Sequence, residues 1–117
     1  MSVLSDYERE ERIIVEGELR CMIVEAKEAV SKAGNPMLVI AVLPSGVNQL
    51  VRAYIVQNQY FNRHLTDVFD AFPSLAGTTE LKEWKGAMGA AMFSTDERGY
   101  IHVEYWIPSE YAKYLPS

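Results

Sequence analysis

The sequence has little cysteine and no long apolar run, and both absences narrow what the chain can be. Its single cysteine, Cys21, excludes an intramolecular disulfide and a cysteine-rich zinc site, and it fits a reducing compartment. The longest apolar run, residues 37–43, is too short to cross a bilayer. The N-terminus is charged where a secretory signal needs an apolar segment. We therefore expect a protein that makes no membrane contact.

The rest of the composition is that of a globular protein, with 49% hydrophobic and 23% charged residues among 117. A chain of this length forms one domain and buries a core without disulfides or metal. The net charge of −5 argues at first against a nucleic-acid partner, but residues 1–18 hold six acidic and two basic residues. The remainder is nearly neutral. We expect an acidic N-terminal arm (1–16), a domain (17–108) and a C-terminal tail (109–117).

The first half of the chain has the side-chain alternation of β-strands, interrupted by clusters of turn-forming residues. The predicted elements are a strand at 17–30, a turn at 31–35, a strand at 37–43, a turn at 44–48 and a strand at 49–57.

Two of these strands carry further information. Every residue of 37–43 is apolar, so both faces of this strand should be covered, one by the core and the other by a partner subunit. On the third strand, Arg52 and Tyr54 share the face opposite Val51 and Ile55. The covered second strand therefore predicts a homo-oligomer, a dimer or larger. The third strand predicts that the Arg52 guanidinium and the Tyr54 ring point outward side by side.

The second half begins with a helical pattern. Apolar residues recur at the spacing of one helix face, Asn58 is a suitable N-cap, and Pro73 marks the end. Residues 80–93 fit either a second helix or a short turn followed by a strand at 85–93. Two glycines in this stretch would each cost a helix about 1 kcal/mol and favour the strand. The apolar residues of the helix face are Phe61, Leu65, Val68, Phe69 and Phe72.

A final hairpin closes the pattern, with a turn at 94–99 and a strand at 100–107. Strict alternation places Tyr100, His102 and Trp106 on one face of that strand. The order is then strand, strand, strand, helix, strand, strand. This predicts a mainly β protein, a β-barrel with one helix, and it is the order of the OB-fold, a five-stranded partly open barrel. In that fold, strands 2 and 3 and the loops 1–2 and 4–5 form the usual binding surface.

Residues 17–107 resemble a family of small phage proteins that are encoded among the phage replication and recombination genes. The resemblance rests on the strand that begins at Gly17, the run Ser-Lys-Ala-Gly-Asn-Pro-Met at 31–37, and Val-Arg-Ala-Tyr at 51–54. The chain also looks like the single-stranded DNA-binding proteins of siphophages, which are OB-fold proteins. The resemblance implies a sequence-nonspecific single-strand binder in the cytoplasm of an infected bacterial host, with a host or phage recombinase as a further partner.

Single strands are bound by cations that follow the phosphates and by aromatic rings that stack on the bases. Lys32 and Asn35 also fit ordinary turn chemistry, and Trp106 fits stacking, an oligomer interface or core packing. The candidate DNA-binding residues are Lys27, Lys32, Asn35, Arg52, Tyr54, Lys85, Arg98, Tyr100 and Trp106.

The sequence predicts no catalytic residue, no metal and no cofactor. Glu25 and Lys27 resemble the Glu-x-Lys element of metal-dependent nucleases, but no earlier acidic residue stands where such a site needs one. A different class stays open: an acidic protein-interaction module that inhibits a basic partner or imitates nucleic acid.

Overall fold

The computed structural model describes residues 14–75 and 78–115. The helical segments are α1 (Phe61–Ala71), α2 (Ser109–Ala112) and the 3₁₀ turns η2 (Pro73–Leu75) and η3 (Leu81–Trp84). The strands are β1 (Gly17–Val30), β2 (Pro36–Pro44), β3 (Val51–Val56), β4 (Met88–Thr95) and β5 (Ile101–Trp106).

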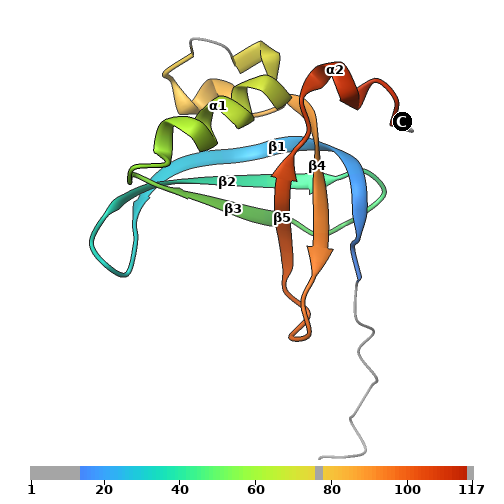
Figure 1. The fold of residues 1–117 in the computed structure, drawn as a ribbon, viewed down its shortest axis with the longest axis horizontal. Helices are drawn as coiled ribbons and strands as arrows, with labels where there is room; N and C mark the ends of the chain where they lie inside the picture. Colours follow the sequence, from blue (N-terminus) through green and yellow to red (C-terminus); the bar gives the residue numbers. More distant parts are fainter. Residues whose placement is uncertain (1–13, 76–77, 116–117) are drawn as a thin grey trace, which may run out of the picture.

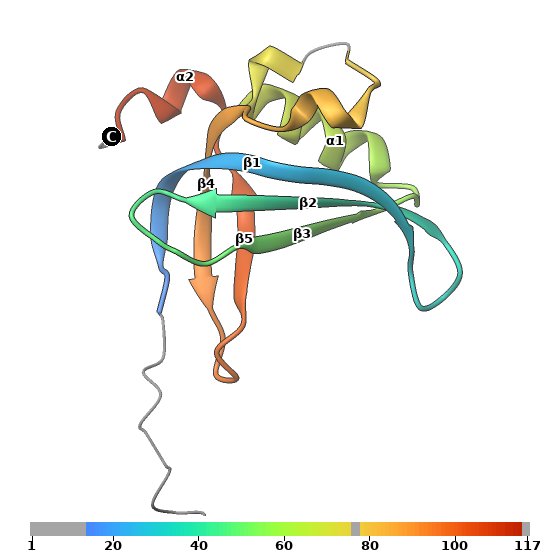
Figure 2. The same ribbon diagram turned by 180° about the vertical axis from the view of Figure 1, so that it is seen from behind.

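The five strands form one antiparallel sheet in the order β3-β2-β1-β4-β5. The two edge strands, β3 and β5, contact each other, so the sheet curls into a nearly closed barrel with an opening between them (Figure 1). From behind, β1, β2 and β3 run side by side (Figure 2). The predicted order and the mainly β, OB-like barrel are confirmed.

β1 is long enough to serve both halves of the barrel. Its first part pairs with β4, and the part from Cys21 to Val30 pairs with β2. The register with β2 shifts between Ile23 and Glu25, which marks a β-bulge. A bulge increases local bending and twist, and here it lies where the strand leaves one partner for the other.

The core lies between the sheet and α1. β1 and β2 contribute alternate residues, and α1 closes one end of the barrel with Val68 and Ala71 (Figure 1). The helix ends at Ala71, as Pro73 predicted. The predicted N-cap is wrong by two positions. Tyr60 precedes the first helical residue, and the Asn58 side chain accepts a hydrogen bond from the Tyr60 N–H at 2.9 Å.

Residues 80–93 form a 3₁₀ turn followed by a strand, which settles the ambiguity in this stretch. The strand is β4, beginning at Met88 rather than at Lys85. At Gly89, the second residue of this strand, a Cβ atom would come within 2.6 Å of the Phe72 ring and 2.8 Å of the Ala71 carbonyl oxygen. β4 therefore passes so closely under the end of α1 that only glycine fits.

The outer face of β2 is buried without a second copy of the chain. Val39 and Ala41 point away from the core, yet they are only 5% and 4% exposed. The longer side chains of the neighbouring strands stand on either side of them. This apolar strand therefore does not require a partner subunit, and the homo-oligomer stays a prediction.

Both ends of the described chain are attached to the barrel. Val15 is buried in the main core, and its N–H donates to the Thr95 hydroxyl at 2.8 Å. At the other end, Ala112 and Leu115 pack with Ala90 and Ile107. The predicted N-terminal arm otherwise lies outside the described residues. No helix within 14–75 or 78–115 is long and apolar enough to span a membrane.

Cys21 lies inside the barrel, 1% exposed, as its apolar neighbours predicted. Burial raises the pKa of its thiol to about 12, because the thiolate would lose its hydration. The cysteine therefore serves as a small apolar core residue rather than as a nucleophile.

Candidate nucleic-acid interface

The register of the sheet brings predicted residues together on the outer face of β1, β2 and β3. Leu38, Ile40 and Val42 point into the core, so Val39 and Ala41 point outward. Paired residues on neighbouring antiparallel strands share a face. Two rows therefore cross the three strands side by side, Lys27–Val39–Tyr54 and Glu25–Ala41–Arg52.

We call this outer face of β1, β2 and β3 the trough. Its floor is the small apolar pair Val39 and Ala41, and the flanking side chains stand higher. Tyr54 is 59% exposed, and Arg52 and Lys27 are exposed as well. The accessible groups of this face are thus a ring, two cations and the exposed carboxylate of Glu25, because the flanking side chains leave Val39 and Ala41 only 5% and 4% exposed. A ring beside cations suits an extended ligand with flat apolar groups and anionic links.

The β1–β2 turn stands at one end of the trough and carries Lys32 and Asn35. Ser31 closes this turn: its N–H donates to the Asn35 carbonyl at 2.8 Å, and its hydroxyl accepts from the Asn35 N–H at 3.1 Å. The backbone of Asn35 therefore makes the hydrogen bonds that close the turn, as the sequence pattern of a turn allowed. The side chains of Lys32 and Asn35 both remain exposed.

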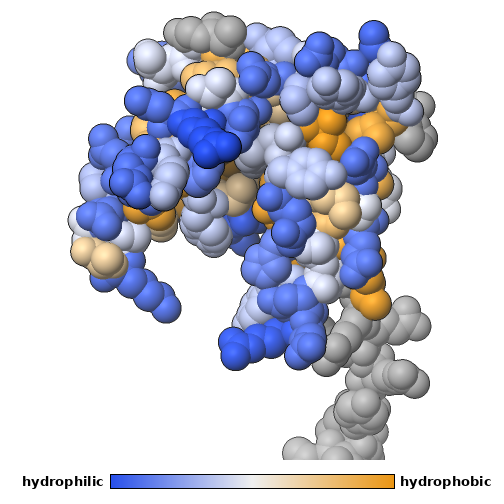
Figure 3. Space-filling view, viewed as in Figure 1, coloured by the Kyte–Doolittle hydropathy of each residue, from blue (hydrophilic) through white to orange (hydrophobic). Residues whose placement is uncertain are grey.

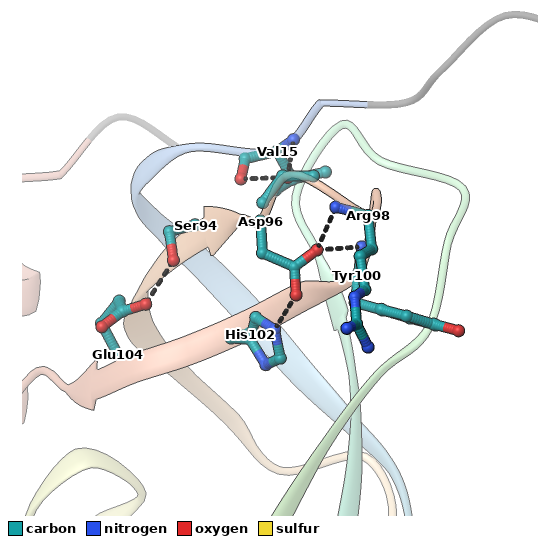
Figure 4. A network of polar contacts seen from close by, with 8 residues as sticks. Val15, Ser94, Asp96, Arg98, Tyr100, His102 and Glu104 are labelled. Atoms are coloured by element: carbon teal, nitrogen blue, oxygen red, sulfur yellow. Dashed lines mark hydrogen bonds and ion pairs between the residues drawn. The ribbon is translucent and has the colours of Figure 1, made fainter.

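The β4–β5 turn carries Arg98 and Tyr100, and a single carboxylate organises it (Figure 4). Asp96 Oδ1 accepts the N–H groups of Arg98 and Tyr100, both at 2.9 Å, and Oδ2 lies 2.8 Å from His102 Nε2. These hydrogen bonds lower the pKa of Asp96, first through His102 and then through the Tyr100 N–H. Sequence reasoning missed this positioning role, although Asp before a Gly-containing turn is its usual signal.

Asp96 should make the stability of the hairpin depend on pH. Its folded-state pKa lies below the ordinary value of 3.8. Its contribution is therefore present above that value and is lost as the pH falls through the folded-state pKa. We expect Asp96→Asn to lower the melting temperature at about pH 5, and the difference from the unmodified chain to shrink toward about pH 2. A difference that stays constant over this range would contradict the role.

The face assignment predicted for β5 is wrong for Tyr105 and Trp106. The register with β4 shifts between Met92 and Phe93, so a bulge in β5 turns the following side chains over. Trp106 therefore points inward and packs edge-on against Phe72, with ring centroids 5.5 Å apart.

The same bulge turns Tyr105 outward. Its hydroxyl donates to Glu18 at 3.0 Å, which raises the pKa of Tyr105. For Trp106 the sequence left open stacking on DNA, an oligomer interface and core packing. The structure shows contacts of core packing, and contact with DNA stays a prediction.

Lys85 is the predicted residue that lies apart from the others. It directly follows η3, whose Trp84 packs edge-on against Phe69 of α1, and it belongs to neither row of the outer face of β2 and β3. The β1–β2 and β4–β5 hairpins, by contrast, project on either side of a hollow in the molecular surface (Figure 3). The hollow is largely hydrophilic in this view.

The structure adds residues that the sequence pattern did not single out. A groove of about 640 Å³ runs between β3, the start of α1 and β5, and Tyr60, Arg63 and His64 line it. Their only sequence signal was a polar helix face, which most surface helices share. Among residues 14–75 and 78–115, no group of three or more histidine, cysteine or acidic side chains could hold a metal ion.

Comparison with known proteins supplies no further assignment. No model of a known protein family matches this chain, and no curated protein matches it either.

Proposed function

We propose that this chain binds single-stranded DNA without sequence preference through the outer face of β2 and β3. One observation carries the proposal: Arg52 and Tyr54 stand two residues apart on β3, a cation beside an exposed ring, next to the floor of Val39 and Ala41. A guanidinium binds phosphate, and a ring stacks on any base because every base has an aromatic face. Such stacking contributes about 1–3 kcal/mol per base.

The two hairpins support the same reading. In OB-type barrels the usual ligand surface is strands 2 and 3 with the loops 1–2 and 4–5. Here these loops carry exposed cations, Lys32 in one and Arg98 in the other. A strand lying across the trough would meet the exposed cations Lys27 and Arg52 of its two rows. The hydrogen bonds around Asp96 hold one of these hairpins ready before the ligand arrives.

The overall acidity does not oppose this function. Six of the sixteen acidic residues lie in 1–18, ahead of most of the domain. The rest of the chain is nearly balanced, so local placement of charge decides binding. On the trough itself, Glu25 lies at the β1 end of its row, with Ala41 between it and Arg52. A phosphate near β3 therefore meets the arginine first.

Fluorescence anisotropy with a labelled thymidine oligonucleotide tests the proposal directly. We expect tight binding that unlabelled duplex does not displace. Raising the salt concentration should weaken it with a log–log slope of about −0.7 per phosphate neutralised. No binding at low salt would overturn the proposal. It would favour the acidic protein-interaction module, which is then tested by measuring binding to a basic protein.

The role in phage DNA replication or recombination is part of the proposal and rests on the resemblance of residues 17–107. So do the recombinase partner and the location in the cytoplasm of an infected host. A homo-oligomer would place several troughs in series and raise the effective affinity for long strands.

A further inference from the structure

A second polar groove begins where the trough ends, at the edge of the barrel. β3 is an edge strand, and beyond it the barrel is open toward β5. The groove in this opening is lined by residues of β3, of α1 and of β5. Arg52 and Tyr54 belong to its lining as well as to the trough. The two surfaces therefore share these side chains and form one continuous path.

The α1 wall of the groove repeats the chemistry of the trough. Tyr60 is 50% exposed and its ring lies roughly parallel to that of His64, at 28° with centroids 6.3 Å apart. Arg63 is exposed between them in the sequence. A cation and a pair of flat rings thus recur one element away from Arg52 and Tyr54.

We propose that the bound single strand does not end on β3 but crosses its edge and continues into this groove. There Arg63 binds a phosphate, and the Tyr60–His64 pair stacks on a base. The inference rests on the proposed function and extends its site to α1, an element outside the usual surface of strands 2 and 3 and loops 1–2 and 4–5.

The acidic side chains of the groove set the orientation of the strand. Asp67 lines it from α1 and Glu104 lines it from β5, and Glu104 accepts a hydrogen bond from the Ser94 hydroxyl. Carboxylates repel phosphate, so the backbone follows Arg52 and Arg63, and the bases turn toward the carboxylates. His102, also in the lining, is held by Asp96 at 2.8 Å and forms the far wall.

The test compares oligonucleotides of two lengths on the full chain, about 6 and about 16 thymidines, both within the range of about 4–16 nucleotides that one barrel of this type covers. We expect Arg63→Ala to leave the short oligonucleotide unaffected and to weaken the long one. The salt slope for the long one should become shallower by about 0.7 for each phosphate that the variant no longer neutralises. Tyr60→Ala should weaken the long oligonucleotide by about 5-fold or more.

Lys82→Ala is the matched control for Arg63→Ala, because it removes one exposed positive charge from η3, outside both surfaces. It should change neither affinity nor slope. If Arg63→Ala and Tyr60→Ala bind both lengths as the unmodified chain does, the strand does not enter the groove and the inference is wrong. The proposed binding at the trough would not be affected by that result. Failure of the unmodified chain to bind either length would instead remove the proposed function itself.

Discussion

Replacing Arg52 and Tyr54 together by alanine should weaken single-strand binding by about 100-fold or more. Loss of one stacked base costs about 1–3 kcal/mol. Loss of a charge-assisted hydrogen bond to phosphate costs about 1.5–3 kcal/mol. Each 1.4 kcal/mol is about a factor of ten in affinity. Both side chains also line the groove beside α1, so the double variant disturbs the whole path. Anisotropy titrations with a thymidine oligonucleotide measure the effect.

Two control variants separate binding from folding in this experiment. Tyr111 on α2 is 59% exposed, as Tyr54 is, so Tyr111→Ala with Lys82→Ala removes a ring and a cation from elsewhere on the surface. That pair should bind normally. Tyr54→Phe keeps the ring and should bind within about 2-fold, because the stacking face is unchanged. An unaltered affinity in the Arg52→Ala/Tyr54→Ala chain would show that the interface lies elsewhere.

Gly89→Ala should lower the free energy of unfolding by about 1–3 kcal/mol, the range for overpacking a filled interior. The new Cβ would lie 2.6 Å from Phe72 Cε1, 2.7 Å from Phe72 Cδ1 and 2.8 Å from the Ala71 carbonyl oxygen. A side chain can rotate, but the carbonyl belongs to the end of α1 and moves only with the helix. Urea denaturation should show a lower midpoint with an unchanged slope.

The clash can be tested through its partner. Phe72→Leu alone removes packing from the core, but combined with Gly89→Ala it should cost less than the sum of the two changes. Coupling of about 0.5–3 kcal/mol is usual for residues in contact. Ser94→Thr adds one methyl group to the same strand at a partly exposed position and should stay within about 0.5 kcal/mol. Additive effects of Gly89→Ala and Phe72→Leu would contradict the close approach.

Much of the fold could be predicted, because strands and helices leave local patterns. The strand at 17–30 was predicted at its observed bounds, and β2 and β3 differ by no more than two residues at an end. The apolar spacing indicated α1, and Pro73 indicated its C-terminal limit, whereas Asn58 as N-cap placed the start two residues too early. The misplaced start of β4 has a non-local cause, since η3 and the packing of Trp84 precede it.

The candidate site was predictable in part. Arg52 and Tyr54 share a face because they are two residues apart on a strand, and that follows from the sequence. The exchange of Tyr105 and Trp106 did not, because a one-residue bulge leaves no mark in a pattern of alternating apolar residues. The turn around Asp96 left a local signal, an Asp ahead of a Gly-containing turn, but its contact with His102 was visible only in the structure.

The sequence by itself determined the order of the elements, the inward side chains at the start of β1 and on β3, and the cation-and-ring pair on β3, since each depends on neighbours a few positions away. Only the tertiary structure decided that Lys27 lies in one row with Tyr54, that β4 passes beneath α1 at Gly89, and that Arg63 borders the same opening as Arg52. These placements depend on strand register and on how far the barrel closes. Both are set by contacts between residues distant in the chain, which no local pattern encodes.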